Sequence, residues 1–187
     1  MSEAYCTTGR FARLGTGYDR HCGPTAVTNL VLTLEEGPEK PRPSEVRQSY
    51  ENETFLRIAK MGAKSRIYWN TSFFGHFGGT SDWLVLFLIR RAIREHGLPA
   101  RSVKGPFLIR ENNLRRELHK GNILYLMVHG NPRYKSHHML CYGEQVRPEG
   151  ILFRVADGWK AVPQYLPAKE LRYGLFYAVS KAPANKD

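Results

Sequence analysis

The sequence predicts an α+β fold in which N-terminal helices pack on a C-terminal antiparallel β-sheet. Apolar residues recur at helical spacing up to about residue 120, whereas short β-rich runs separated by turn residues follow. Helices followed by strands favour this segregated arrangement over alternating parallel units. With 187 residues, 42% of them hydrophobic and 24% charged, the chain suits one domain spanning residues 1–187, with 1–15 and 182–187 flexible.

The helices are predicted from apolar periodicity and from residues that begin or end a helix. Pro24 suits the opening turn of the first helix, and Ser81 or Asp82 is the expected N-cap of a later one that ends at His96. The predicted helical regions are 23–34, 44–60 (one or two short helices), 81 or 82 to 96, and 112–120.

The strands are predicted from β-branched and aromatic runs bounded by turn chemistry. These runs cover residues 122–129, 138–143, 151–156 and 174–180. Residues 67–82 lack a helical period and contain several glycine breaks, so we predict a long loop there. Because long loops within domains are usually functional, this loop is the expected substrate wall, with Trp69, Phe74, Gly78 and Gly79 as its binding residues.

The three cysteines must be interpreted individually, because an odd number without repeated Cys-x-x-Cys spacing indicates neither a disulfide framework nor a zinc site. We expect no metal and no cofactor. Cys141 is expected in the core, whereas Cys22 stands immediately before the first helix. The positive end of the helix dipole there favours a thiolate and lowers the pKa of a cysteine. Cys22 is therefore the candidate nucleophile.

A general base and a residue that orients it are available on neighbouring strands. His137 and His138 begin one predicted strand, and Asp157 ends the next. Two antiparallel strands can place a histidine at the start of one beside an aspartate at the end of the other, which would fix the imidazole tautomer. Adjacent residues on a strand point to opposite faces, so only one histidine can meet Cys22.

The segment HCGPTAVTNLVL resembles the nucleophile helix of papain-like cysteine peptidases, in particular the bacterial branch similar to the bacteriocin-leader peptidases. HHMLCYG resembles the base strand of that branch, in which a glycine follows the histidine by six positions, as Gly143 follows His137. VADGW resembles the segment that carries the third residue. These matches cover residues 18–34 and 137–159, and the chain between them fits only in outline.

The resemblance implies a papain-like fold and a cysteine peptidase or related thiol hydrolase that cleaves a peptide or amide bond. In this interpretation the Cys22 thiolate attacks the carbonyl carbon, His137 protonates the leaving group, Asp157 orients His137, and an acyl thioester is then hydrolysed. The family generally places an oxyanion-hole glutamine six residues before the nucleophile, where this chain has Thr16. The Cys22 N–H and the Tyr18 hydroxyl are the donors expected instead.

The distribution of charge and the lack of a visible targeting signal limit the partners that we expect the protein to bind. The net charge of +11 is concentrated between Arg90 and Lys120, where nine basic residues face three acidic ones. Because Phe107 is the only aromatic residue there, we do not expect a nucleic-acid site and interpret this face as a docking surface for an acidic peptide or amide substrate. No signal peptide or membrane span is visible, which predicts a cytoplasmic protein that does not bind membranes. The oligomeric state is not predicted.

Two other functions fit the same sequence. An acyltransferase of the same fold would hand the acyl group to an amine instead of water. A catalytically inactive module would use the basic helices to bind a polyanion, and its cysteine would react with the ordinary thiol pKa of about 8.5.

Overall fold

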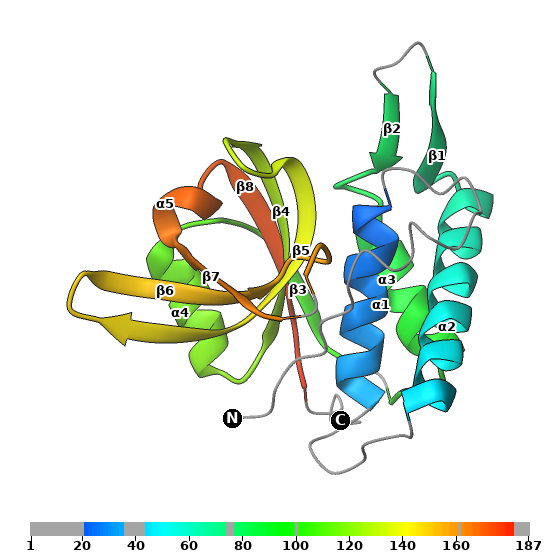
Figure 1. The fold of residues 1–187 in the computed structure, drawn as a ribbon, viewed down its shortest axis with the longest axis horizontal. Helices are drawn as coiled ribbons and strands as arrows, with labels where there is room; N and C mark the ends of the chain where they lie inside the picture. The colour runs from blue at the N-terminus through cyan, green and yellow to red at the C-terminus, as the bar shows by residue number, and fades with distance from the viewer. Residues whose placement is uncertain (1–20, 36–43, 74–76, 100, 161, 182–187) are drawn as a thin grey trace.

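The computed structural model describes residues 21–35, 44–73, 77–99, 101–160 and 162–181 (Figure 1). Both segments predicted to be flexible, residues 1–15 and 182–187, lie outside this part of the chain. The described residues form five helices, namely α1 (Cys22–Glu35), α2 (Ser44–Lys64), α3 (Val85–Glu95), α4 (Glu111–His119) and α5 (Ala168–Leu171). No helix among them is long and apolar enough to span a membrane.

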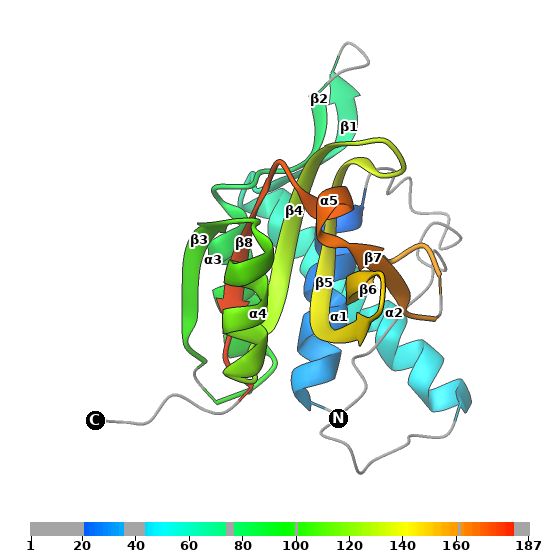
Figure 2. The ribbon, with the colours of Figure 1, turned by 90° about the vertical axis from the view of Figure 1, so that its left-hand side faces the viewer.

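The predicted α+β class with an antiparallel sheet is confirmed. Eight strands are described: β1 (Tyr68–Phe73), β2 (Phe77–Thr80), β3 (Val103–Leu108), β4 (Ile123–Asn131), β5 (Lys135–Arg147), β6 (Gly150–Ala156), β7 (Gln164–Pro167) and β8 (Gly174–Val179). Six of them form one antiparallel sheet in the order β3-β8-β4-β5-β6-β7, and β1 and β2 form a separate hairpin. Figure 2, viewed from the side of the sheet, shows this hairpin projecting beyond it.

The sheet buries both of its faces, because side chains alternate between two cores. On β4, Tyr125 and Met127 pack toward α1, α2 and α3, whereas Leu124 and Leu126 pack toward α4. The same alternation continues on β5, where Leu140 belongs to the first core. Figure 1 accordingly shows α1, α2 and α3 on one side of the sheet and α4 on the other. The sheet therefore fixes which face each residue of β5 presents to α1.

Residues 67–82 are not the predicted loop but include the β1–β2 hairpin. Tyr68 pairs with Thr80, and Trp69 pairs with Gly79. Tyr68 is fully buried and packs with Phe55 of α2, so tertiary contacts hold the hairpin to the helices. Glycine breaks and the absence of a helical period could not distinguish such a hairpin from a loop. The hairpin sets the position of Thr80 beside the first turn of α1.

Four further differences concern short elements and the ends of helices. Residues 44–60 belong to a single helix that continues to Lys64. The strands β3 and β7 were missed, because both are short edge strands and each contains a proline, which an edge position tolerates. The four-residue helix α5 was missed as well. The helix expected to begin at Ser81 or Asp82 begins at Val85, with Leu84 as its N-cap residue.

Substitution of Gly23 by alanine tests the contact between α1 and the hairpin. A Cβ at Gly23 would overlap the Thr80 side chain, whereas a Cβ at Gly143 would meet its nearest neighbour, Arg154 Cβ, at 3.8 Å. Gly23→Ala should lower the free energy of unfolding by about 1–3 kcal/mol through overpacking. Gly143→Ala should cause no loss. Urea denaturation followed by circular dichroism measures both, and equal stability of the two variants would contradict the contact.

Candidate active site

The first turn of α1, which carries Cys22, packs between β2 and the segment that follows β6. Gly23 packs against Thr80 of β2, and Thr25 packs against Gly158, where a Cβ would lie 2.9 Å from Thr25 Cγ2. The turn is closed by the Thr25 N–H, which donates to His21 O at 2.9 Å. The predicted placement of Cys22 at the start of this helix is confirmed. Its sulfur consequently lies among β2, the start of β5 and the segment after β6.

The pKa of the Cys22 thiol is raised, contrary to the lowered value expected from the helix terminus. Burial is the largest influence and disfavours the thiolate. The N–H groups of His138, Gly23 and Cys22 itself point to the sulfur and oppose this effect, whereas the charge of Asp82 adds to it. Desolvation therefore outweighs the helix dipole, and Cys22 is a neutral thiol at pH 7.

His137 retains a ring nitrogen that can accept a proton. Its Nε2 donates to the carbonyl oxygen of Asp157 at 2.7 Å, and because a carbonyl can only accept, the proton of the neutral ring is assigned to Nε2. Nδ1 has no hydrogen-bond partner among the described residues. Burial lowers the pKa of His137, more than the bond to Asp157 raises it, so the ring is neutral at pH 7. The unprotonated Nδ1 is an available base.

Aromatic side chains enclose this imidazole. Tyr134 stacks on the His137 ring with centroids 5.4 Å apart and an interplanar angle of 17°. The Trp159 ring lies 4.9 Å from His137 on a tilted plane. His137 itself is only 4% exposed, although Trp159 is 51% exposed. The two rings shield the hydrogen bond between His137 and Asp157 from water, which strengthens it.

Asp157 orients His137 through its main-chain carbonyl, not through the side-chain carboxylate that the sequence had led us to expect. Oδ1 accepts the N–H groups of Trp159 at 2.9 Å and Lys160 at 3.0 Å, and Oδ2 accepts the Tyr134 hydroxyl at 3.1 Å. The carboxylate thus closes the turn after β6 and holds both aromatic rings that enclose His137. Asp157 and His137 are brought together as predicted, but by a carbonyl oxygen.

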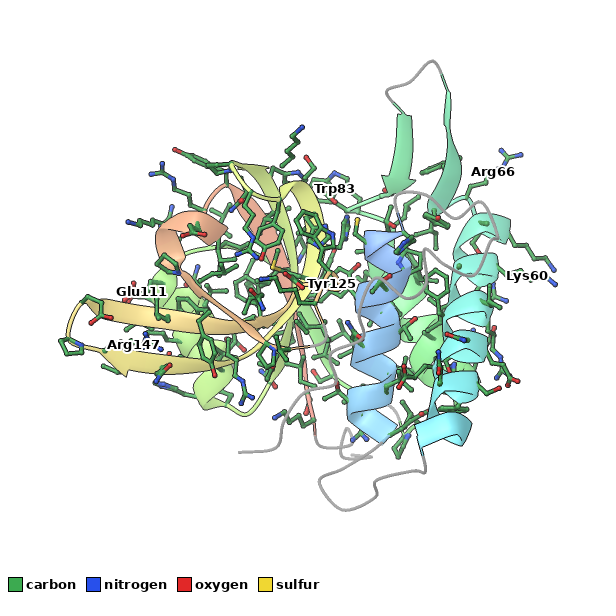
Figure 3. The ribbon with its side chains drawn as sticks, viewed as in Figure 1. Lys60, Arg66, Trp83, Glu111, Tyr125 and Arg147 are labelled. Atoms are coloured by element: carbon green, nitrogen blue, oxygen red, sulfur yellow. The ribbon has the colours of Figure 1, made fainter. Side chains whose placement is uncertain are left out.

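His138 lies on the face of β5 that meets α1, and both of its ring nitrogens are occupied. Nδ1 is 2.9 Å from the Tyr125 hydroxyl, and Nε2 is 3.3 Å from Asp82 Oδ1. Figure 3 shows Tyr125 between the sheet and α1, with Trp83 above it near the upper end of β5. No hydrogen bond in the described part of the chain joins Cys22 Sγ to either imidazole. Although adjacent residues of β5 point to opposite faces, both histidines line the cavity with Cys22, contrary to the expectation that only one could approach it. Of the two, His137 keeps a free ring nitrogen.

Two residues of the site, Asp82 and His129, were not anticipated from the sequence. The Asp82 carboxylate also binds His129 Nε2 at 2.7 Å. Burial would raise the pKa of Asp82, but hydrogen bonds and charge from His138 and His129 outweigh it and hold the pKa below its ordinary value. Asp82 resembled a helix N-cap in the sequence, yet α3 starts three residues later and Ser81 Oγ accepts the Leu84 N–H, weakly, at 3.4 Å. Nothing in the local pattern connects Asp82 with two distant histidines.

Cys22, His137, His138, Asp82 and Asp157 line one cavity of about 810 Å³. Of the predicted substrate-binding residues, Gly79 lines it, whereas Trp69 lies on β1 without lining it, and Gly78 belongs to β2. Phe74 and the proposed oxyanion donor Tyr18 lie outside the described residues. Trp83 and Trp159, both strongly exposed, line the mouth instead. Within the described ranges no group of three His, Cys, Asp or Glu side chains could hold a metal ion.

The basic residues of α4 are not a free cationic surface. Arg115 pairs with Glu144 at 3.2 Å, and Glu117 pairs with Arg116 at 3.1 Å and with Lys120 at 2.8 Å. The helix α4 lies on the opposite side of the sheet from α1 (Figure 1). The part of the predicted docking surface that lies on α4 is therefore partly neutralised and is on the side of the sheet away from α1.

Comparison of the chain with protein-family models, with curated proteins and with solved structures finds no match in any of the three. The cavity contains a thiol and a neutral imidazole, one nitrogen of which is fixed by a carbonyl oxygen.

The raised pKa of Cys22 predicts the pH dependence of its alkylation. A raised thiol pKa leaves little thiolate at neutral pH, so the rate with iodoacetamide should stay low at pH 6 and 7 and rise above the ordinary thiol pKa of about 8.5. Quantitative mass spectrometry of the Cys22 peptide between pH 6 and 10 measures this rate. A fast plateau already present at pH 6 would show a preformed thiolate and contradict the desolvated site.

Proposed function

We propose that the protein is a cysteine peptidase or related thiol hydrolase that cleaves a peptide or amide bond with Cys22, His137 and Asp157. One observation carries the proposal. His137 Nε2 is fixed on Asp157 O at 2.7 Å, which leaves Nδ1 as a free acceptor, and His137 and Cys22 line the same cavity. A nucleophile, a base and a group that orients the base are the components of thiol hydrolysis.

Because both groups are neutral at rest, proton transfer accompanies attack. As Cys22 Sγ bonds to the substrate carbonyl carbon, its proton passes to His137 Nδ1 and the carbonyl oxygen becomes an oxyanion. The C–N bond then breaks, His137 returns the proton to the leaving nitrogen, and an acyl thioester remains. Water attacks the thioester with His137 as base, and the acid and the free thiol are released.

The start of α1 can stabilise the oxyanion. The first N–H groups of a helix have no intrahelical acceptor, and that of Cys22 lies beside the reacting sulfur. The same donor is expected from the sequence. The second donor that replaces the missing glutamine, for which we propose Tyr18, lies outside the described residues.

The arrangement of elements supports a papain-like fold. The nucleophile begins the first described helix, this helix packs against β5, and β5 and the end of β6 supply the base and its partner. This is the order that the resemblance of HCGPT, HHMLCYG and VADGW implies.

The cavity mouth suggests a polypeptide substrate. Trp83 and Trp159 offer apolar surface, and Lys135 at the same mouth has no ion-pair partner among the described residues. Such a mouth suits an apolar side chain near the scissile bond and an acidic group close to it. The acidic preference thus rests on Lys135, since Arg115 and Arg116 are ion-paired on the far side of the sheet.

Removal of the nucleophile and of the base tests the proposal. Cys22→Ala should abolish cleavage of a diverse peptide library, and His137→Ala should lower the rate about 10²- to 10⁴-fold, the usual contribution of a general base. His119→Ala, a change at an exposed histidine of α4, is the control and should cleave like the wild type. Mass spectrometry of the products measures the rates. Cleavage that survives Cys22→Ala would contradict the proposal, and amide products in the presence of an amine would indicate acyl transfer.

Substitutions of Asp157 test how it orients His137. The Asp157→Asn change retains a side-chain oxygen for the N–H groups of Trp159 and Lys160, and it retains the main-chain carbonyl that holds His137. This variant should therefore keep peptide cleavage within about tenfold of the wild type. Asp157→Ala loses the turn and should be at least about tenfold slower than Asp157→Asn, because misplacement of a catalytic group is costly. Equally inactive variants that both fold, judged by circular dichroism, would show that the negative charge itself is required.

A further inference from the structure

A second cluster of imidazoles and a carboxylate lies in the same cavity. Asp82 precedes α3, His129 lies on β4 and His138 lies on β5, so three segments distant in the sequence meet at one carboxylate. Oδ2 is 2.7 Å from His129 Nε2, and Oδ1 is 3.3 Å from His138 Nε2. The catalytic mechanism proposed above uses none of these three side chains.

We propose that Asp82 is a positioning residue of the active site: by binding His138 and His129 it fixes the start of β5, which presents the His138 N–H to Cys22 Sγ and carries His137. This inference rests on the proposed function, since it assigns a role toward the same nucleophile and base. Asp82 acts through its neighbours and contacts neither the substrate nor the reacting atoms.

Hydrogen bonds connect Asp82 through His138 and Tyr125 to Gly23, the residue after Cys22. His138 is bound on one side by Asp82 and on the other by Tyr125, whose hydroxyl also lies 3.5 Å from Gly23 O. The carbonyl of Asp82 accepts the Tyr177 hydroxyl of β8 at 3.5 Å. A loss of the carboxylate would therefore loosen the side of the cavity formed by β4, β5 and the first turn of α1.

The register of the sheet explains why this position needs support. The first residue of β5 that pairs with β6 is Leu140, so His137 and His138 are paired only with β4. The unpaired edge leaves the His138 N–H free to point to Cys22 Sγ. Strand pairing on one side alone restrains this edge weakly, and the contact between His138 and Asp82 supplies the missing restraint.

Asp82 also carries a negative charge close to the sulfur, which raises the pKa of Cys22. Loss of this charge should lower that pKa and increase the thiolate fraction at neutral pH, whereas loss of the positioning should slow catalysis. The two effects have opposite signs, which a purely structural role would not produce. The other titratable groups that line the cavity are His21, His129, Tyr134, Lys135, His137, His138 and Asp157, and Tyr125 also interacts with the Cys22 charge.

The experiment compares Asp82→Asn with Glu144→Gln. Glu144 is a matched control, because its carboxylate also binds a histidine, His119 at 3.0 Å, but on the α4 side of the sheet. Asp82→Asn should alkylate at Cys22 about 3- to 10-fold faster than the wild type at pH 7.5, since each pKa unit changes the thiolate fraction up to tenfold. Its kcat for peptide cleavage should fall about tenfold or more with a smaller change in KM. Glu144→Gln should match the wild type in both.

His129→Leu keeps the inference testable if Asp82→Asn does not fold. His129 is partly exposed, and its replacement by an apolar side chain removes one donor while the Asp82 charge remains. Its kcat should fall, and its alkylation should not become faster. An Asp82→Asn profile identical to the wild type between pH 6 and 10, or faster alkylation of His129→Leu, would overturn the inference. A wild type that cleaves no peptide would instead overturn the proposed function, because alkylation needs no substrate.

Discussion

The packing of α1 against β5 is the contact on which the candidate site depends. It brings the first turn of the helix to the edge where β5 is not yet paired with β6, so that the His138 N–H points to Cys22 Sγ. The alternation of side chains on β5 then sends His138 toward the helices, with Leu140 in the same core. A shift of one residue in this register would exchange the two histidines and break the hydrogen bond between His137 Nε2 and the Asp157 carbonyl oxygen.

Desolvation determines the protonation states of Cys22 and His137 in the cavity. The same contact that positions Cys22 also buries it, and burial disfavours the thiolate more than the helix terminus and three N–H groups favour it. Burial likewise disfavours the imidazolium of His137. Both groups are thus neutral at rest. This agrees with the proposed transfer of the Cys22 proton to His137 during attack, which does not require a preformed thiolate–imidazolium ion pair. The neutral pair also costs less to bury than two charges.

Sequence patterns succeeded where the signal is local. The helix that follows Cys22 has apolar residues at helical spacing and a proline in its first turn, and the strands after residue 120 are bounded by clear turns. The pattern failed for Asp82 and for the β1–β2 hairpin. An aspartate before a helix has the same local appearance whether it caps the helix or binds two histidines, and Tyr68 stabilises the hairpin through contacts with α2.

The sequence by itself therefore determined the helices α1 to α4, the strands β4, β5, β6 and β8, the antiparallel sheet, and the place of Cys22 at the start of a helix. Short-range periodicity, proline and turn residues carry that information. Only the tertiary structure decided which histidine keeps a free nitrogen, that Asp157 holds His137 by its carbonyl, and that the Cys22 thiol is protonated. These properties depend on burial and on hydrogen-bond partners from distant parts of the chain, which no local pattern specifies.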